Sequence, residues 1–140
     1  MLRDLLTQLD YLGILVAAVA GMILGGIWYL PNIMGNAWMA ALGRRQWNLG
    51  DPRKAILVRG LATLTTSLAL AVLMVGGGVT TVGGSLRLGL VVSLGVVVPT
   101  IVADYRLAGW PNALTVITAT HRFLHVMVMC AVLGVFRVLS

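Results

Sequence analysis

Four long apolar stretches constrain the fold more than any other feature of the sequence. They cover residues 11–30, 55–75, 86–103 and 113–136. About 20 apolar residues in a helix cross the roughly 30 Å hydrocarbon core of a bilayer. Hydrophobic residues make up 59% of the chain and charged residues only 10%, a balance that excludes an ordinary soluble domain. We therefore predict an all-α integral membrane protein, in which a four-helix bundle forms a single domain over residues 1–140.

Prolines and their neighbours mark where the predicted helices begin, bend and end. Pro31 ends the first span, because proline cannot continue a helix without the loss of a hydrogen bond. Asp51 followed by Pro52 is typical of a helix start, so the second helix should begin near residue 52. Pro99 should kink the third span near its end.

The connection between the first two spans, residues 32–54, contains a short amphipathic pattern. Trp38, Met39 and Leu42 recur at near-helical spacing ahead of a basic segment. An aromatic ring at the interface with basic residues toward water is typical of a helix that lies in the head-group region. We predict a short interfacial helix between spans one and two.

The basic residues are distributed unevenly about the spans, and they give the chain a net charge of +6. One side carries Arg44, Arg45, Arg53, Lys54 and Arg106, whereas the other carries Arg3, Arg87 and Arg137. Basic residues concentrate on the cytoplasmic side of membrane proteins. We therefore predict that both termini face outside and that the large loop faces the cytoplasm. The positive charge does not indicate nucleic-acid binding.

Aromatic residues gather at the predicted cytoplasmic interface. They are Trp28, Tyr29, Trp38, Trp47, Tyr105 and Trp110, and only Tyr11 falls at the opposite interface. Aromatic belts usually form at both interfaces. The asymmetry favours a specialised cytoplasmic mouth, and the alternative is that small apolar residues suffice on the other side.

One face of the first span carries almost no side chains. Gly13, Ala17, Gly21 and Gly25 recur every four residues and therefore share a face of the helix. Small residues at this spacing allow another helix backbone to approach closely. The neighbour is either another span of this chain or a second copy. We predict that this face supports association with itself or with a larger complex.

The last apolar stretch contains a polar stripe. On a helix, Thr118, His121, Arg122, His125 and Met129 occupy one sector about 100° wide. An ionisable group within a membrane span costs about 2.5–3.5 kcal/mol by insertion scales, and it usually faces the bundle interior or a wet cavity. The stripe is therefore the place where a function should lie.

Arg59, near the start of the second span, and Asp104, at the end of the third, belong to the same leaflet as Arg122. On the third span, Gly89, Ser93, Val97, Thr100 and Asp104 follow the spacing of one helix face. A buried pair between Asp104 and an arginine is one interpretation. In a second interpretation, the last helix begins only at Phe123, and Arg122 then lies at the membrane–water interface. The third is a cytoplasm-facing pocket for an anionic small molecule or lipid head group, formed by Arg59, Asp104, His121, Arg122 and His125.

The two histidines also allow a cofactor interpretation. His121 and His125 at i and i+4, with Met129 one turn further, would suit copper. A single histidine could instead ligate a haem or chlorophyll-type ring. A hydrolytic zinc site is excluded, because position 122 is arginine where that motif requires glutamate. We expect no cofactor, since Arg122 would repel a cation.

Several short patterns resemble a family of small bacterial four-span membrane proteins of unknown function. Residues 26–31 read G-I-W-Y-L-P, and with Gly25 before them they match the family pattern G-x-x-W-Y-x-P. A G-x-x-W-M stretch follows at Gly35, Trp38 and Met39. Later matches are Gly95, Pro99, Pro111, Leu114 and Ile117. Met34 replaces the usual phenylalanine, and Thr120 with His121 replaces a Gly-Tyr pair. The resemblance implies a four-helix fold in the bacterial inner membrane and brings no established activity.

No catalytic arrangement accompanies these patterns. The sequence contains no glutamate, phosphate-binding loop or cysteine cluster, and no serine has a histidine near it in sequence. We therefore predict a non-enzymatic protein embedded in the lipid bilayer, which is either a subunit of a larger assembly or a homo-oligomer. Binding or transport of an anionic molecule and the cofactor interpretation are the alternatives.

Overall fold

The computed structural model describes residues 2–44 and 50–139, so Arg45 and Trp47 lie outside the described residues. Within these ranges the chain forms helices and π-helical turns and no strand. The elements are α1 (Leu2–Thr7), α2 (Tyr11–Trp28), the π-helical turn η1 (Pro31–Gly35), α3 (Asn36–Leu42), α4 (Pro52–Gly76), α5 (Val82–Val92), the π-helical turn η3 (Ser93–Val97), α6 (Val98–Leu107) and α7 (Asn112–Leu139).

Four helical segments in the described residues are long and apolar enough to cross a membrane. They are Tyr11–Trp28, Pro52–Gly76, Val82–Leu107 and Asn112–Leu139. The predicted all-α membrane bundle is therefore confirmed, and the protein is a small multi-pass membrane protein. Most helices extend past the apolar windows, because helical hydrogen bonding continues until a cap or a breaker ends it.

The structure tests the predicted starts of the second and the last span. The Asp51 side chain accepts a hydrogen bond from the backbone N–H of Arg53 at 2.9 Å, which confirms the helix start at Pro52. The alternative in which the last helix begins at Phe123 is wrong, because α7 already begins at Asn112. Its first turns are polar, but they contain no breaker after Pro111.

The segment after α2 forms a compact turn. The backbone N–H of Gly35 donates to the carbonyl of Leu30 at 2.9 Å, closing a π-helical turn over Pro31–Gly35. A side chain at Gly35 would meet the carbonyl oxygen of Tyr29, so this turn requires glycine. α3 follows directly as the predicted short helix, and it ends at Gly43 in the left-handed conformation.

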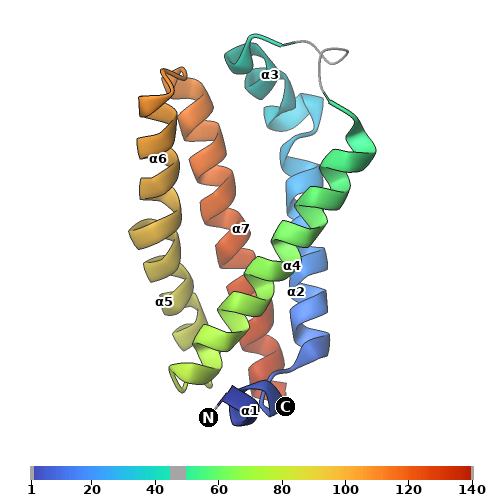
Figure 1. The fold of residues 1–140 in the computed structure, drawn as a ribbon, viewed down its shortest axis with the longest axis vertical. Helices are drawn as coiled ribbons and strands as arrows, with labels where there is room; N and C mark the ends of the chain where they lie inside the picture. The colour runs from blue at the N-terminus through green and yellow to red at the C-terminus, as the bar shows by residue number, and fades with distance from the viewer. Residues whose placement is uncertain (1, 45–49, 140) are drawn as a thin grey trace.

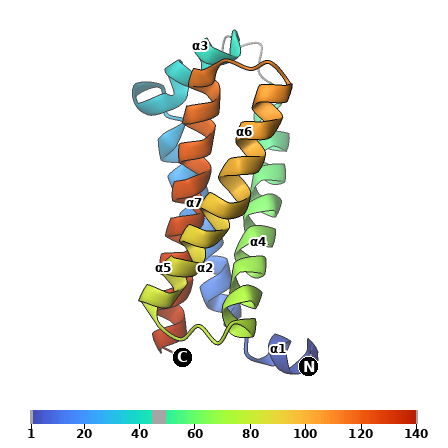
Figure 2. The same cartoon turned by 90° about the vertical axis from the view of Figure 1, so that its left-hand side faces the viewer.

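α2 and α7 form the centre of the bundle, and the two outer spans separate toward one end (Figure 1). α2 packs against α7 and α4, and α5 packs against α7. Figure 1 shows α4 crossing the bundle on a diagonal, so that α4 and the α5–α6 helix meet at one end and diverge toward the other. As Figure 2 shows, α1 and the end of α7 lie at the narrow end, whereas α3 lies at the wide end.

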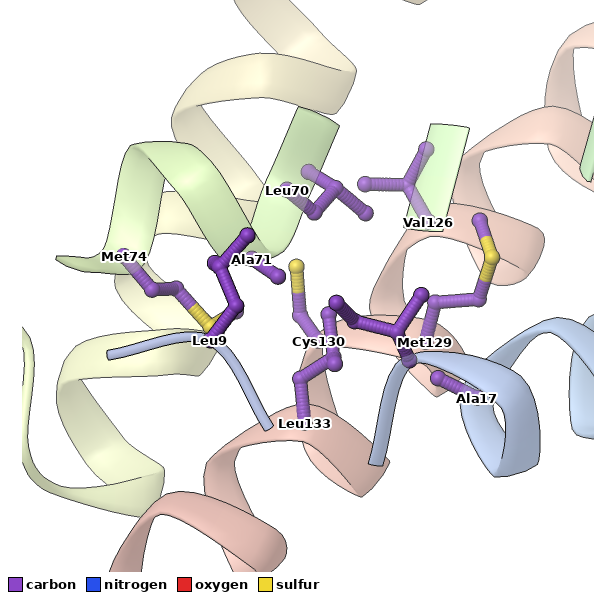
Figure 3. Close-up of a cluster of buried hydrophobic side chains, with 10 residues drawn as sticks. Leu9, Ala17, Leu70, Ala71, Met74, Val126, Met129, Cys130 and Leu133 are labelled. Atoms are coloured by element: carbon purple, nitrogen blue, oxygen red, sulfur yellow. The ribbon is translucent and has the colours of Figure 1, made fainter. Parts of the chain in front are cut away.

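The narrow half of the bundle is filled by apolar side chains from α2, α4 and α7 (Figure 3). Leu70 and Met74 of α4 belong to one buried cluster with Met129 and Leu133 of α7. Cys130 is buried beside them with a free thiol. Because lipid is as apolar as these side chains, close packing stabilises this region more than removal from solvent does.

The glycine face of α2 is buried within the chain. A Cβ atom at Gly13 would lie 2.8 Å from the Cβ of Phe136, and one at Gly21 would lie 2.8 Å from the Nε2 of His125. A Cβ atom at Gly25 would lie 2.5 Å from the Nη2 of Arg59. The close neighbours are thus α4 and α7 of the same chain, which leaves this face no surface for a second copy.

Candidate functional site

A polar face on α4 organises the wide half of the bundle. Arg59, Thr63 and Ser67 follow one another at intervals of four residues, so they share one side of the helix. Thr63 and Ser67 are buried and Arg59 is half-buried. Each of the three meets a polar partner on α2 or α7, which forms three successive polar layers.

The first layer joins Arg59 to His121. The Nη2 atom of Arg59 lies 3.2 Å from the Nε2 atom of His121, and its guanidinium lies 4.9 Å from the centre of the Tyr29 ring. A guanidinium can only donate hydrogen bonds, so Nε2 of His121 accepts and the imidazole is neutral with its proton on Nδ1. The missing side chain at Gly25 provides the space for Arg59.

The second and third layers lie deeper along α4. The Thr63 hydroxyl lies 3.4 Å from the Nε2 atom of His125, in the space left by Gly21. Ser67 donates a hydrogen bond of 2.8 Å to the carbonyl of Ile14. Below Ser67 the apolar packing of the narrow half begins. The polar layers therefore end inside the bundle.

Aromatic rings surround the His121 imidazole. The ring centres of Tyr29 and Trp28 lie 5.1 Å and 6.1 Å from that of His121, and His125 lies at 5.6 Å. Tyr29 also packs edge-on against Trp38 of α3 at 5.5 Å. These contacts connect the polar layers to the aromatic residues at the wide end.

A pocket of about 600 Å³ lies in the wide half, above the polar layers. Its volume falls in the range of roughly 300–1,000 Å³ that is typical of small-molecule sites. The lining residues come from η1, α3, α4, α6 and α7, together with the residue that follows α2. They are Tyr29, Pro31, Gly35, Trp38, Met39, Ala55, Val58, Arg59, Ala62, Tyr105, Thr118 and Arg122.

The charge in this pocket is positive and uncompensated. Arg59 and Arg122 both line it, and none of its described lining residues is acidic. Among the described residues, Arg122 has no hydrogen-bond or ion-pair partner. Burial raises the pKa of Tyr29 above its ordinary value, against the opposing effects of the Arg59 and Arg122 charges. The Tyr29 phenol therefore stays neutral and adds no negative charge.

Asp104 does not belong to this pocket, and its predicted place there is wrong. Within the described residues no ion pair joins it to Arg59 or Arg122, and it is exposed on α6. The reason is the π-helical turn at Ser93–Val97. It adds one residue to the helix, which rotates the following face by about 100°. Gly89 and Ser93 are accordingly buried, whereas Asp104 is not.

Three buried polar atoms near His121 lack a hydrogen-bond partner among the described residues. They are Nε1 of Trp28, Oγ1 of Thr118 and Nδ1 of His121. Thr118 lies near the Tyr29 phenol but outside hydrogen-bonding geometry. Buried polar groups are normally paired. Of the three residues only Thr118 lines the pocket, so its hydroxyl is the one that a ligand or an ordered water there would satisfy.

The geometry is unfavourable to a cation at the histidines. The Nε2 atoms of His121 and His125 face Arg59 and Thr63, and Met129 lies in the apolar core. The described residues contain no group of three or more histidine, cysteine or acidic side chains that could hold a metal. The copper and haem interpretations remain predictions.

Sequence reasoning predicted that Arg59, His121, Arg122 and His125 line one pocket. In the structure Arg59 and Arg122 line it, whereas His121 and His125 lie in the polar layers beneath, and several neighbours were missed. Thr63 and Ser67 could have been found from the sequence, because they continue the four-residue spacing that starts at Arg59. The small residues on α2 have the same spacing, which indicates that the two helix faces could pack together. Tyr29 was noted only as an interfacial aromatic residue. Its position over the Arg59 guanidinium depends on the turn at Gly35, which the sequence pattern did not reveal.

Comparison with known proteins places the chain in a family. The family described as "Protein of unknown function (DUF1761)" matches residues 12–134, a range that includes every residue of the pocket and of the three polar layers. No curated protein and no solved structure matches the chain. The family match covers most of the sequence and confirms the predicted resemblance to an uncharacterised family. The chain therefore belongs to the DUF1761 family, whose function is unknown.

Proposed function

We propose that this protein binds an anionic ligand in the pocket of the wide half. The observation that carries the proposal is the pair Arg59 and Arg122, which line one pocket whose described lining residues include no acidic side chain. A cation inside a membrane span normally has a counter-charge or faces water. A carboxylate or phosphate group would supply that counter-charge, because guanidinium geometry matches both groups.

The surrounding groups support an acceptor-rich ligand. The Thr118 hydroxyl lines the pocket and is buried without a partner in the described residues. His121 is not among the lining residues, but its Nε2 accepts from Arg59 and so helps to hold that guanidinium at the pocket. A hydroxyl and two guanidinium groups favour a ligand that supplies oxygen atoms. Aromatic rings from Tyr29, Trp38 and Tyr105 would contact its apolar part.

The test is a charge-removal series in gentle detergent. Arg59 is half-buried and Arg122 is exposed to the pocket. We expect Arg122→Gln and Arg59→Gln each to weaken binding of monoalkyl phosphates and carboxylates about tenfold or more, because a hydrogen bond to a charged group contributes about 1.5–3 kcal/mol. Arg53→Gln is the matched control, since Arg53 is exposed near the start of α4 and does not line the pocket. Native mass spectrometry measures occupancy. Equal binding of a neutral alkyl alcohol would contradict the proposal.

The distribution of basic residues supports a proposal for the protein's orientation in the membrane. We propose the bacterial inner membrane with the termini outside, which places α3 and the pocket on the cytoplasmic side. The asymmetry of basic residues supports this orientation. Cysteine labelling with an impermeant maleimide tests it: position 3 should react from outside intact cells, and position 53 should not.

Membership of a homo-oligomer or a larger assembly remains a prediction. The glycine face does not serve such an assembly, since α4 and α7 of the same chain cover it. A contact with another chain would have to use a lipid-facing surface. Mass spectrometry of the intact protein from gentle detergent would report copies, partner chains and bound lipid together.

A further inference from the structure

The pocket is open toward the side of the bundle, between α4 and α6. Its wall includes Ala55, Val58 and Ala62, which are exposed on the outer flank of α4, and Val58 is 65% exposed. Tyr105 of α6 forms part of the lining on the other side. We infer that the ligand is a single-chain anionic amphiphile that reaches the pocket sideways from the bilayer. This inference rests on the proposed anion binding.

The opening follows from the way the helices pack. α4 packs mainly on α2, whereas α6 packs on α7. Residues 77–81 connect α4 to α5 at the narrow end. Figure 1 shows the separation of α4 and α6 increasing toward the wide end, and residues of both helices line the pocket. The separation faces the lipid surface of the bundle, so a molecule already in the bilayer meets it directly.

The depth of the two arginines also favours an amphiphile. Along their helices, Arg59 lies about 10 Å from the start of α4 and Arg122 about 15 Å from the start of α7. Trp38 and Met39 of α3 line the pocket from the end that faces the head groups. The anionic group therefore lies below the interface, and the path away from it toward the bilayer is apolar.

The pocket composition matches a molecule with one charged end and one apolar end. Arg59, Arg122 and Thr118 form the polar part, and Val58, Ala62 and Met39 contribute apolar walls. Its volume of about 600 Å³ is large for a bare anion, and a drug-sized ligand would fill it. A phosphate or carboxylate head group with one alkyl chain fits both parts, since the chain leaves along the exposed flank of α4.

The experiment uses photolabelling of the full chain in phosphatidylcholine nanodiscs. The probe is an oleoyl lysophosphatidic acid with a diazirine near the end of its chain, and cross-linked peptides are mapped by mass spectrometry. We expect labelling to concentrate on residues 55–62 of α4 and near Tyr105. Ala62→Trp narrows the opening and should reduce the yield at least tenfold. Ala69→Trp, on an exposed position of α4 outside the pocket, should leave it unchanged.

Competition separates this inference from the proposed function. Unlabelled oleoyl lysophosphatidic acid should compete with the probe, whereas butyl phosphate and inorganic phosphate should compete at least a hundredfold less well. Equal competition by inorganic phosphate would leave anion binding standing and overturn the lipid inference. Labelling spread evenly over all lipid-facing helices, or unchanged in Ala62→Trp, would mean annular lipid only and would also overturn it. If no anion of any kind binds the wild type, the proposed function fails as well. Ala55→Trp replaces Ala62→Trp should that variant not fold.

Discussion

Gly21→Ala tests whether the missing side chains on α2 hold the buried imidazole in place. The added Cβ would lie 2.8 Å from Nε2 of His125 and 3.1 Å from Cγ2 of Thr63. Ordinary contact begins at 3.4 Å, so the shortfall toward His125 is about 0.6 Å. Both neighbours are buried, so a shift of either side chain would disturb the packing around it. The helices must therefore separate, or the Thr63–His125 contact must break.

The expected magnitude follows from two opposing terms. Overpacking a close contact costs about 1–3 kcal/mol. Replacing glycine by alanine in a helix contributes about 1 kcal/mol in the other direction. Gly26→Ala carries only the second term, because a Cβ at Gly26 meets nothing within 4 Å. The difference in unfolding free energy between the two variants therefore isolates the overpacking term, and Gly21→Ala should be the less stable by about 1–3 kcal/mol.

Unfolding by sodium dodecyl sulfate in dodecyl maltoside micelles, followed by circular dichroism, measures this difference. The double variant Gly21→Ala with His125→Ala provides a check, since removing the imidazole opens the space that the new methyl group needs. The double variant should recover part of the loss. If Gly21→Ala and Gly26→Ala unfold at the same detergent fraction, the close approach of α2 to His125 does not contribute to stability and the reasoning is wrong.

Other predictions concern single groups. Ser67→Ala removes the buried hydrogen bond to Ile14 and should lower the free energy of unfolding by about 0.5–1.7 kcal/mol. Thr65→Val, at an exposed position of the same helix, should change it less. Burial favours the neutral Tyr29 phenol, so its ionisation midpoint should lie above about 10, and deprotonation at higher pH should destabilise the fold. The difference in ultraviolet titration between wild type and Tyr29→Phe measures that midpoint, and a value of 10 or lower would contradict the assignment.

Much of the fold was predictable because the bilayer restricts the choice of structures. A stretch such as residues 55–75 has to be a helix if it crosses hydrocarbon, since its backbone groups have no other partners there. Asp51 and Pro52 then located the start of that helix correctly. The capping role of Asp10, whose carboxylate accepts from the backbone N–H of Gly13 at 2.9 Å, was missed although aspartate before a helix is a common signal.

The site was only partly predictable, because periodicity describes one helix at a time. It indicated that His121 and His125 share a face, but it could not identify Arg59 and Thr63 as their partners across the bundle. It also assumed uniform helical geometry. The π-helical turn after Val92 breaks that assumption, and for this reason Asp104 was assigned to the wrong face.

The close approach of α2 to the polar layers restricts how sequences in this family can vary. The Arg59 guanidinium occupies the space left by Gly25, and the His125 imidazole occupies the space left by Gly21. A relative with alanine or a larger residue at either glycine should therefore carry a shorter side chain at the matching position. Homologous sequences should show these two pairs changing together, so that loss of a glycine and loss of the facing cation or imidazole occur in the same lineages.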